Sequence, residues 1–216
     1  MNLYFDIETI PAEESLKGTI VELEKKREKK REATEAAESG IGYRRKKTNE
    51  MIYRATALSG DFGRIFCIGY ALGDDPVDII RGQESEILKK WWGIADRADL
   101  FVGHNIMDFD LPFIYKRSII HKIKPAARHL NLSFARYRSD PIFDTMKEWD
   151  KWALRASISL DKLAKVLGLP TSKDGGIDGS KVYDAYLVGK YDQICEYCKR
   201  DVELTRKVFK RMNFLK

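Results

Sequence analysis

The sequence predicts an α/β fold in which a mixed β-sheet is flanked by α-helices, with a charged helical segment inserted after the first strand. Three observations indicate this fold. Residues 3–8 alternate between apolar and polar side chains, which is typical of a strand. Residues 64–81 hold two more strand-like runs around a turn, and residues from 144 onward are mainly helical in pattern. Strands followed by helices in this order are typical of a layered α/β domain.

The length and composition limit the class of protein. With 216 residues, the chain is expected to be one domain spanning residues 1–216. It has no apolar run long enough to span a membrane and no charged-then-apolar leader, so we expect a soluble, cytoplasmic protein. A formal net charge of +6 suits a polyanionic partner such as nucleic acid.

The three cysteines are too few for a disulfide framework. Cys195 and Cys198 form a C-x-x-C pattern, which would be compatible with a zinc or redox site. Because no second C-x-x-C is present and only three histidines occur, we expect two small residues on the partly buried face of a helix instead.

The first strand carries two acidic side chains. Asp6 and Glu8 alternate with the apolar residues Phe5 and Ile7, and side chains two apart on a strand project from the same face. Carboxylates held this close raise each other's pKa unless a cation neutralises them. A hard divalent ion, Mg²⁺ or Mn²⁺, is the cation that favours such oxygen ligands.

A long charged segment, residues 13–57, follows the first strand. Residues 22–38 are rich in helix formers with opposite charges three and four apart, and residues 39–42 should interrupt the helix. The segment is interpreted either as a solvated arm or self-association element, or as a nucleic-acid guide. In the guide, residues 44–47 would clamp phosphates and Tyr43 and Tyr53 would stack a base. Runs of charge are usually solvated, which favours the arm.

The middle of the chain predicts a hairpin from residues 64–71 and 77–81, a helix over 83–98 and a short buried strand over 100–103. Asp110 should open or enter a helix that tolerates Pro112 in its first turn. Asp144 is interpreted as a helix cap that follows a strand, rather than as an outer-shell acid. Residues 174–179 are interpreted as a connector beside the site.

The last helix is predicted over residues 191–212, where apolar positions recur every three or four residues, with Asp192 as a candidate cap. Tyr197 and Asp201 are four residues apart and therefore share a helix face. A phenol beside a metal-binding carboxylate can orient a water molecule, which is what a hydrolytic reaction requires.

Three motifs occur in the order Asp6-Ile-Glu8-Thr, Gly103-His-Asn-x-x-x-Phe-Asp110-Leu-Pro-Phe-Ile and Tyr197-x-x-x-Asp201. Together they resemble the motifs of the DEDD superfamily of 3′–5′ exonucleases, and the tyrosine is the mark of the DEDDy branch. The second motif, with residues 160–170 and 177–182, resembles the proofreading domains of family B DNA polymerases and their free-standing relatives. The resemblance covers nearly the whole chain except residues 13–57, and it implies a ribonuclease H-like fold.

The resemblance implies hydrolysis of terminal phosphodiester bonds with two ions, Mg²⁺ or Mn²⁺, about 4 Å apart, releasing nucleoside 5′-monophosphates. Asp6, Glu8 and Asp201 would hold the first ion, Asp6 would bridge to the second, and Asp110 would help to place it. Tyr197 would position the attacking water. The implied substrate is the 3′ end of nucleic acid, expected to be single-stranded DNA, and replication or repair proteins are candidate partners.

Asp110 is preferred to Asp108 as the ligand, because residues 109–114 match the family pattern and Asp108 falls in its variable gap. For substrate binding, the resemblance implies that Thr9 and Ile10 contact the terminal sugar and separate the last bases. His104 and Asn105 would face the scissile nucleotide, although His104 is equally interpreted as a hydrogen-bonded histidine at a strand end.

Two other classes of function stay open. One is a ribonuclease or an endonuclease on the same scaffold, and the other is a non-catalytic nucleic-acid-binding module. The presence of all four acids and the tyrosine argues against the binding module.

Overall fold

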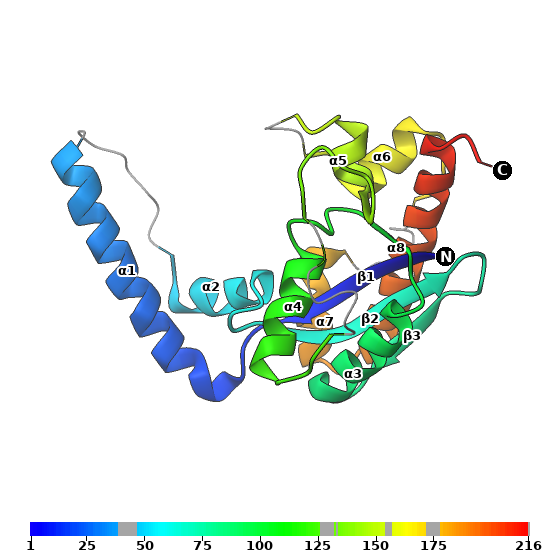
Figure 1. Ribbon diagram of the computed structural model, residues 1–216. Helices are drawn as coiled ribbons and strands as arrows, with labels where there is room; N and C mark the ends of the chain where they lie inside the picture. The colour runs from blue at the N-terminus through cyan, green and yellow to red at the C-terminus, as the bar shows by residue number, and fades with distance from the viewer. Residues whose placement is uncertain (39–46, 126–131, 133, 154–156, 172–177, 216) are drawn as a thin grey trace.

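A computed structural model describes residues 1–38, 47–125, 132, 134–153, 157–171 and 178–215 (Figure 1). Its centre is a five-stranded sheet in the order β3-β2-β1-β4-β5. The strands are β1 (Asn2–Ile10), β2 (Arg64–Leu72), β3 (Asp78–Arg81), β4 (Leu100–Gly103) and β5 (Ile142–Asp144). β1, β2 and β3 pair antiparallel, whereas β4 pairs parallel to both β1 and β5. The predicted mixed sheet and its hairpin are therefore confirmed.

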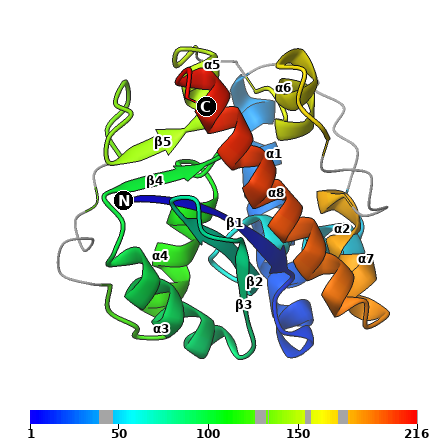
Figure 2. The ribbon, with the colours of Figure 1, turned by 90° about the vertical axis from the view of Figure 1, so that its right-hand side faces the viewer.

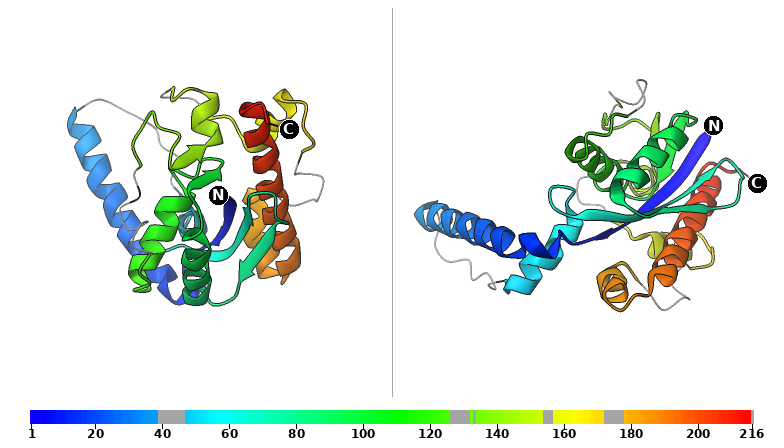
Figure 3. Two further views of the ribbon diagram at one scale, coloured as in Figure 1. Left: turned by 45° about the vertical axis from the view of Figure 1, so that its right-hand side comes forward. Right: turned by 90° about the horizontal axis from the view of Figure 1, so that it is seen from below.

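Helices cover both faces of this sheet (Figures 2 and 3). The helices α3 (Glu84–Ala95) and α4 (Asp110–Ile120) lie on one face, and α7 (Val182–Leu187) and α8 (Tyr191–Met212) lie on the other. Two shorter helices, α5 (Thr145–Trp149) and α6 (Leu160–Val166), contact α8. The helix α8 crosses β1 and β2, so its inward side chains meet those of the central strand.

The alternation within β1 divides the core into two parts. Leu3, Phe5 and Ile7 are buried in the cluster on the α3 and α4 face, where Phe5 packs against Trp91. Tyr4 points the other way and its ring meets that of Phe209 on α8. Because side chains two apart share a face, Asp6 and Glu8 also point to the α8 side.

The start of α8 differs in one detail from the prediction. Asp192 does not cap the helix: the capping position is Lys190, and no side chain caps the first turn. Asp192 lies inside that turn, where its carboxylate accepts a 2.9 Å bond from Arg81. An acid in the first turn still favours the helix dipole, so it remains suited to that position.

The inserted segment forms an arm. A short 3-10 turn (Glu14–Leu16) leads into α1 (Lys17–Glu38), which begins before the predicted start at residue 22 and projects from the body of the protein (Figure 1). The chain returns through α2 (Asn49–Arg54) and a 3-10 turn (Ala55–Leu58). Among residues 17–31 of α1, whose side chains the structure describes, only Ile20 and Val21 are buried, and they pack against Ile52 and Tyr53.

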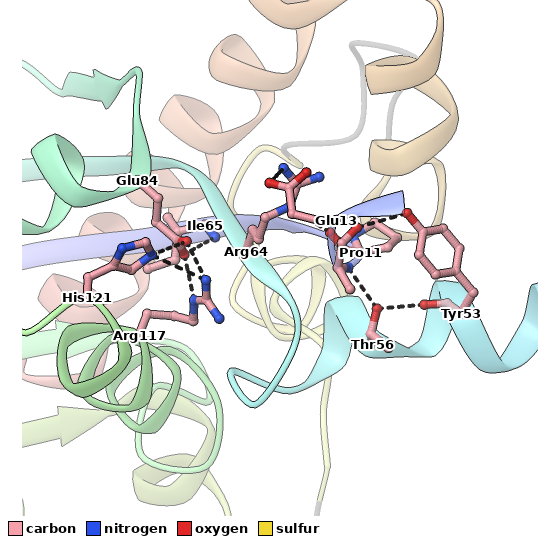
Figure 4. Close-up of polar contacts among 10 residues, drawn as sticks. Pro11, Glu13, Tyr53, Thr56, Arg64, Ile65, Glu84, Arg117 and His121 are labelled. Carbon is pink, nitrogen blue, oxygen red and sulfur yellow. Dashed lines mark hydrogen bonds and ion pairs between the residues drawn. The ribbon is translucent and has the colours of Figure 1, made fainter. Parts of the chain in front are cut away.

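The base of the arm is fastened to the chain that leaves β1 (Figure 4). The Tyr53 hydroxyl donates to the carbonyl of Ala12 at 2.8 Å, and the Ala12 amide donates to Thr56 Oγ1 at 3.0 Å. Tyr53 is 2% exposed and its ring belongs to the core, which argues against the part of the guide interpretation in which it stacks a base. Tyr43 and residues 44–46 of the expected phosphate clamp lie outside the described residues.

A buried ion pair between Glu84 and Arg117 joins the start of α3 to the C-terminal part of α4, and a further bond from Ile65 joins it to β2 (Figure 4). Glu84 accepts bonds from Arg117 Nε at 2.9 Å and Nη2 at 2.6 Å, from the Ile65 amide at 2.8 Å, and contacts His121 Nε2 at 2.8 Å. Burial opposes ionisation of Glu84, but the bonds from Arg117 and Ile65 hold its pKa below the usual value. All of its oxygens are therefore satisfied, which a buried charge requires.

Within the described part of the chain, no helix has the length and apolar content of a membrane span.

Candidate metal centre

The strand β1 supplies two acidic groups to a polar site under α8. The donor atoms of Asp6, Glu8 and Cys198 lie within 4.8 Å of one another. The register of β1 against β2 changes directly after Glu8, between Glu8 and Thr9. The pair of acids thus lies on the last regular stretch of the antiparallel ladder, as the alternating sequence predicted.

The helix α8 contributes Tyr197 and Asp201, one turn apart and each 9% exposed. Burial raises the pKa of the Tyr197 phenol, and the nearby carboxylates of Asp201 and Glu8 and a hydrogen bond with Asp201 raise it further. The phenol therefore keeps its proton at neutral pH and acts as a hydrogen-bond donor. A Cβ at Gly179 would lie 4.0 Å from the hydroxyl, so the last residue of the predicted connector adjoins the phenol.

Asp110 reaches the same site from the first residue of α4. It is 3% exposed, and its Oδ1 accepts a 3.1 Å bond from the Ile7 amide. The pairing between β1 and β4 extends only from Asn2 to Tyr4 along β1, so Asp110 satisfies an amide beyond the parallel ladder. Asp108 is exposed and forms an ion pair with Lys147. The structure therefore brings Asp110, and not Asp108, to β1.

Asp110 and Asp201 lie close enough to the acids of β1 to raise the pKa values of both Asp6 and Glu8. Burial is the largest cause for Asp6, followed by repulsion from Asp110, Glu8 and Asp201. Burial likewise raises the pKa of Glu8, with repulsion from Asp201 and Asp110. For Asp110, burial raises the pKa to about 7, against the bonds from backbone amides that lower it.

Such a group of acids has the chemistry of a divalent-ion site. Carboxylate oxygens are the ligands of Mg²⁺ and Mn²⁺, and bound ions are often the largest local charges in a site. The repulsion that the half-buried Asp6 and the buried Glu8 receive from Asp110 and Asp201 is the observation that fits a metal, because one or two divalent ions would remove it. The residues that would hold the ions are Asp6, Glu8, Asp110 and Asp201.

Asp144 has a larger part than the sequence indicated. It caps α5 as predicted, accepting from the amides of Met146 at 3.0 Å and Lys147 at 3.3 Å. It also accepts from the amides of Asn105 at 2.9 Å and Met107 at 3.0 Å, and so holds the loop that leads from β4 to Asp110. The cap is a local signal that sequence can indicate, but the second pair of bonds joins residues nearly 40 positions apart.

His104 is a hydrogen-bonded histidine at the end of a strand, which is one of the two interpretations of this residue from the sequence. Its Nε2 donates to the carbonyl of Ile158 at 2.9 Å, and its Nδ1 lies 2.9 Å from Thr145 Oγ1. Burial lowers the pKa of the imidazole, which favours the neutral ring. With both nitrogens in use, the expected contact with a nucleotide has no support here. Asn105 remains half-buried beside it, with a left-handed backbone at φ 65°.

The other two residues expected to touch substrate have structural partners. Thr9 Oγ1 donates to the carbonyl of Ala57 at 2.7 Å, which fastens the returning arm to β1. Ile10 is 4% exposed and packs in the cluster that contains Phe66 and Val182. Ile10 lines the edge of a surface pocket with Phe62 and Arg64, and its expected contact with the terminal bases stays a prediction.

The three cysteines lie together between α8 and β2. All are free and buried, as expected for Cys195 and Cys198 on the inward face of α8. The sequence reasoning missed that Cys198 touches a candidate metal ligand. The signal available was its place directly after Tyr197 in the third motif.

Comparisons with known proteins agree with this geometry. Residues 74–216, which include Asp110, Tyr197 and Asp201, match the family described as a predicted 3′–5′ exonuclease related to the exonuclease domain of PolB. The chain is 26% identical over 166 residues to an uncharacterized protein of Methanocaldococcus jannaschii, covering 72% of this chain and 89% of that protein.

The fold is similar to that of a solved polymerase. The family B DNA polymerase from the hyperthermophilic archaeon Pyrobaculum calidifontis superposes with a TM-score of 0.61 at 14% identity, over 99% of this chain and 24% of the polymerase. The chain thus spans about a quarter of that protein's length. From the family match and the ribonuclease H-like sheet, we conclude that this chain belongs to the family of predicted 3′–5′ exonucleases related to the exonuclease domain of PolB.

Proposed function

We propose that the protein is a metal-dependent 3′–5′ exonuclease that hydrolyses the terminal phosphodiester bond of single-stranded DNA and releases nucleoside 5′-monophosphates. One observation carries the proposal: buried carboxylates from β1, α4 and α8 lie close enough to repel one another, beside a protonated phenol. Family membership supports the nuclease class, and the +6 charge suits a polyanionic substrate.

Each acid has a role in this proposal. Asp6, Glu8 and Asp201 would hold one ion, and Asp6 would be shared with a second ion that Asp110 helps to place. When bound, the ions supply activation of the water and stabilisation of the leaving oxygen. The Ile7 amide keeps Asp110 turned toward β1, and Asp144 fixes the loop that precedes it.

Tyr197 would orient the attacking water. Its phenol keeps a proton at neutral pH and donates, so it holds a water rather than removing its proton. Its neighbour Asp201 lies on the same helix face, which places the donor one turn from a ligand. The first part of α8 therefore combines water orientation with metal binding on one rigid element.

The test uses a 5′-end-labelled single-stranded DNA with Mg²⁺, with Mn²⁺ and with EDTA, beside an RNA of the same sequence. The proposal expects a ladder of products shortened from the 3′ end, no products in EDTA, and release of 5′-monophosphates. Asp201→Ala serves as the matched inactive variant. Internal cuts would support an endonuclease, degradation of RNA alone would support a ribonuclease, and intact but bound oligonucleotides would support a binding module.

A further inference from the structure

The helix α8 lies unusually close to the sheet at one point. Gly69 on β2 is the register partner of Asp6 on β1. A Cβ at position 69 would lie 2.9 Å from Cys198 Sγ and 3.0 Å from Val202 Cγ2, which is closer than ordinary contact. The absence of a side chain at Gly69 therefore makes the space in which the Cys198 thiol sits.

The thiol in that space contacts Asp6 twice. Cys198 is fully buried, and its Sγ lies 3.5 Å from the backbone oxygen of Asp6 and 3.6 Å from Asp6 Oδ2. A thiol has one proton to donate, so the two oxygens share it. The contact with Oδ2 gives the Asp6 carboxylate a hydrogen-bond donor from α8 and so restrains its direction.

We propose that Cys198, seated against Gly69, is a positioning residue that fixes the Asp6 carboxylate and its distance from the helix-borne ligand Asp201. Cys198 and Asp201 are three residues apart on α8, so both project to the same side of the helix. The contact from sulfur to Asp6 thus joins the ligands of the strand to the ligand of the helix. This inference rests on the proposed function of the site.

Cys195 provides a matched control within the same helix. It is also buried and lies near Glu8, but its hydrogen bonds are with Cys67 and with Arg81, at 3.9 Å from the guanidinium, whereas Cys198 bonds directly to the ligand Asp6. A general effect of removing a buried thiol from α8 would appear in both cysteine variants. An effect on the Asp6 carboxylate would appear in Cys198 variants alone.

The experiment measures Mn²⁺ binding to the full chain by electron paramagnetic resonance, with the melting temperature in EDTA as a check of folding. Cys198→Ala removes the donor and should weaken Mn²⁺ binding about 10-fold, the size expected when a hydrogen-bond partner of a metal ligand is lost. Cys198→Ser keeps a donor and should stay within about 3-fold of the wild type. Cys195→Ala should bind as the wild type does.

Gly69→Ala tests the spacing separately, because it keeps the thiol but pushes it outward. The rate of DNA degradation should fall more with Mg²⁺ than with Mn²⁺, since Mg²⁺ demands near-ideal octahedral geometry. If this variant does not fold, the cysteine variants decide the inference. Equal Mn²⁺ binding by Cys198→Ala and the wild type, or equal weakening by Cys195→Ala, would overturn it. Wild-type protein that bound no Mn²⁺ would overturn the proposed function, and this inference with it.

Discussion

Replacing Asp110 by Asn should stabilise the metal-free protein at neutral pH. In the native state burial raises the pKa of Asp110 to about 7, whereas its ordinary value is 3.8. The native protein therefore holds this proton more tightly than the unfolded chain does. Asn keeps the oxygen that accepts from the Ile7 amide but carries no charge to bury.

The sign and size follow from proton linkage. Between pH 3.8 and about 7 the native state binds more protons than the unfolded state, so the free energy of unfolding falls as pH rises. The difference between a pKa of 3.8 in the unfolded chain and about 7 in the native state corresponds to a loss of up to about 4 kcal/mol in the free energy of unfolding, at about 1.4 kcal/mol for each pKa unit. The stability that Asp110 contributes below pH 3.8 is thus lost as pH rises to about 7 and is not regained above it. This is a large fraction of the stability of an ordinary domain.

Urea denaturation in EDTA, at several pH values from 4 to 8, measures this effect. The stability of Asp110→Asn minus that of the wild type should grow as pH rises through about 7, and the variant gains further because the Asp110 charge no longer raises the pKa values of Asp6 and Glu8. With saturating Mg²⁺ the advantage should disappear, because the ion neutralises the carboxylate in the wild type. A stability difference that did not change with pH would show that Asp110 is not buried among these acids.

The remaining predictions concern the other groups of the site and its supports. Mg²⁺ or Mn²⁺ should raise the melting temperature of the wild type but raise that of Asp201→Ala much less, because binding to the native state stabilises it, and calorimetry with and without EDTA checks this. Tyr197→Phe should slow DNA hydrolysis about 10-fold or more with Mn²⁺ binding unchanged; an unaltered single-turnover rate would remove its role. Asp144→Ala should lower stability by about 3 kcal/mol, since four backbone amides lose a charged acceptor, and should slow hydrolysis, as urea denaturation and rate measurements would show. Glu84→Gln should cost about 3 kcal/mol by leaving the buried Arg117 poorly paired, with metal binding unaffected; weakened Mn²⁺ binding would contradict this separation.

The sequence alone determined the local elements and the residue types of the site. Alternation over residues 3–8 predicted that Asp6 and Glu8 share a face, because a strand turns successive side chains to opposite sides. The helical period over residues 191–212 predicted α8 and placed Tyr197 one turn from Asp201. Cap and turn signals predicted the hairpin and the helix after Asp144, since each depends on a few neighbouring residues.

Only the tertiary structure decided which distant groups meet. The bond from the Ile7 amide to Asp110 spans 103 positions, and although the motif favoured Asp110 over Asp108 as a ligand, no local pattern predicts this bond. The burial of Ile10 and Tyr53, the two bonds of His104 and the contact of Cys198 with Asp6 likewise depend on how elements pack, as does the space above Gly69. The periodicity of apolar residues predicts which side of a helix or strand faces the core. The residues that this side contacts depend on how the whole chain packs.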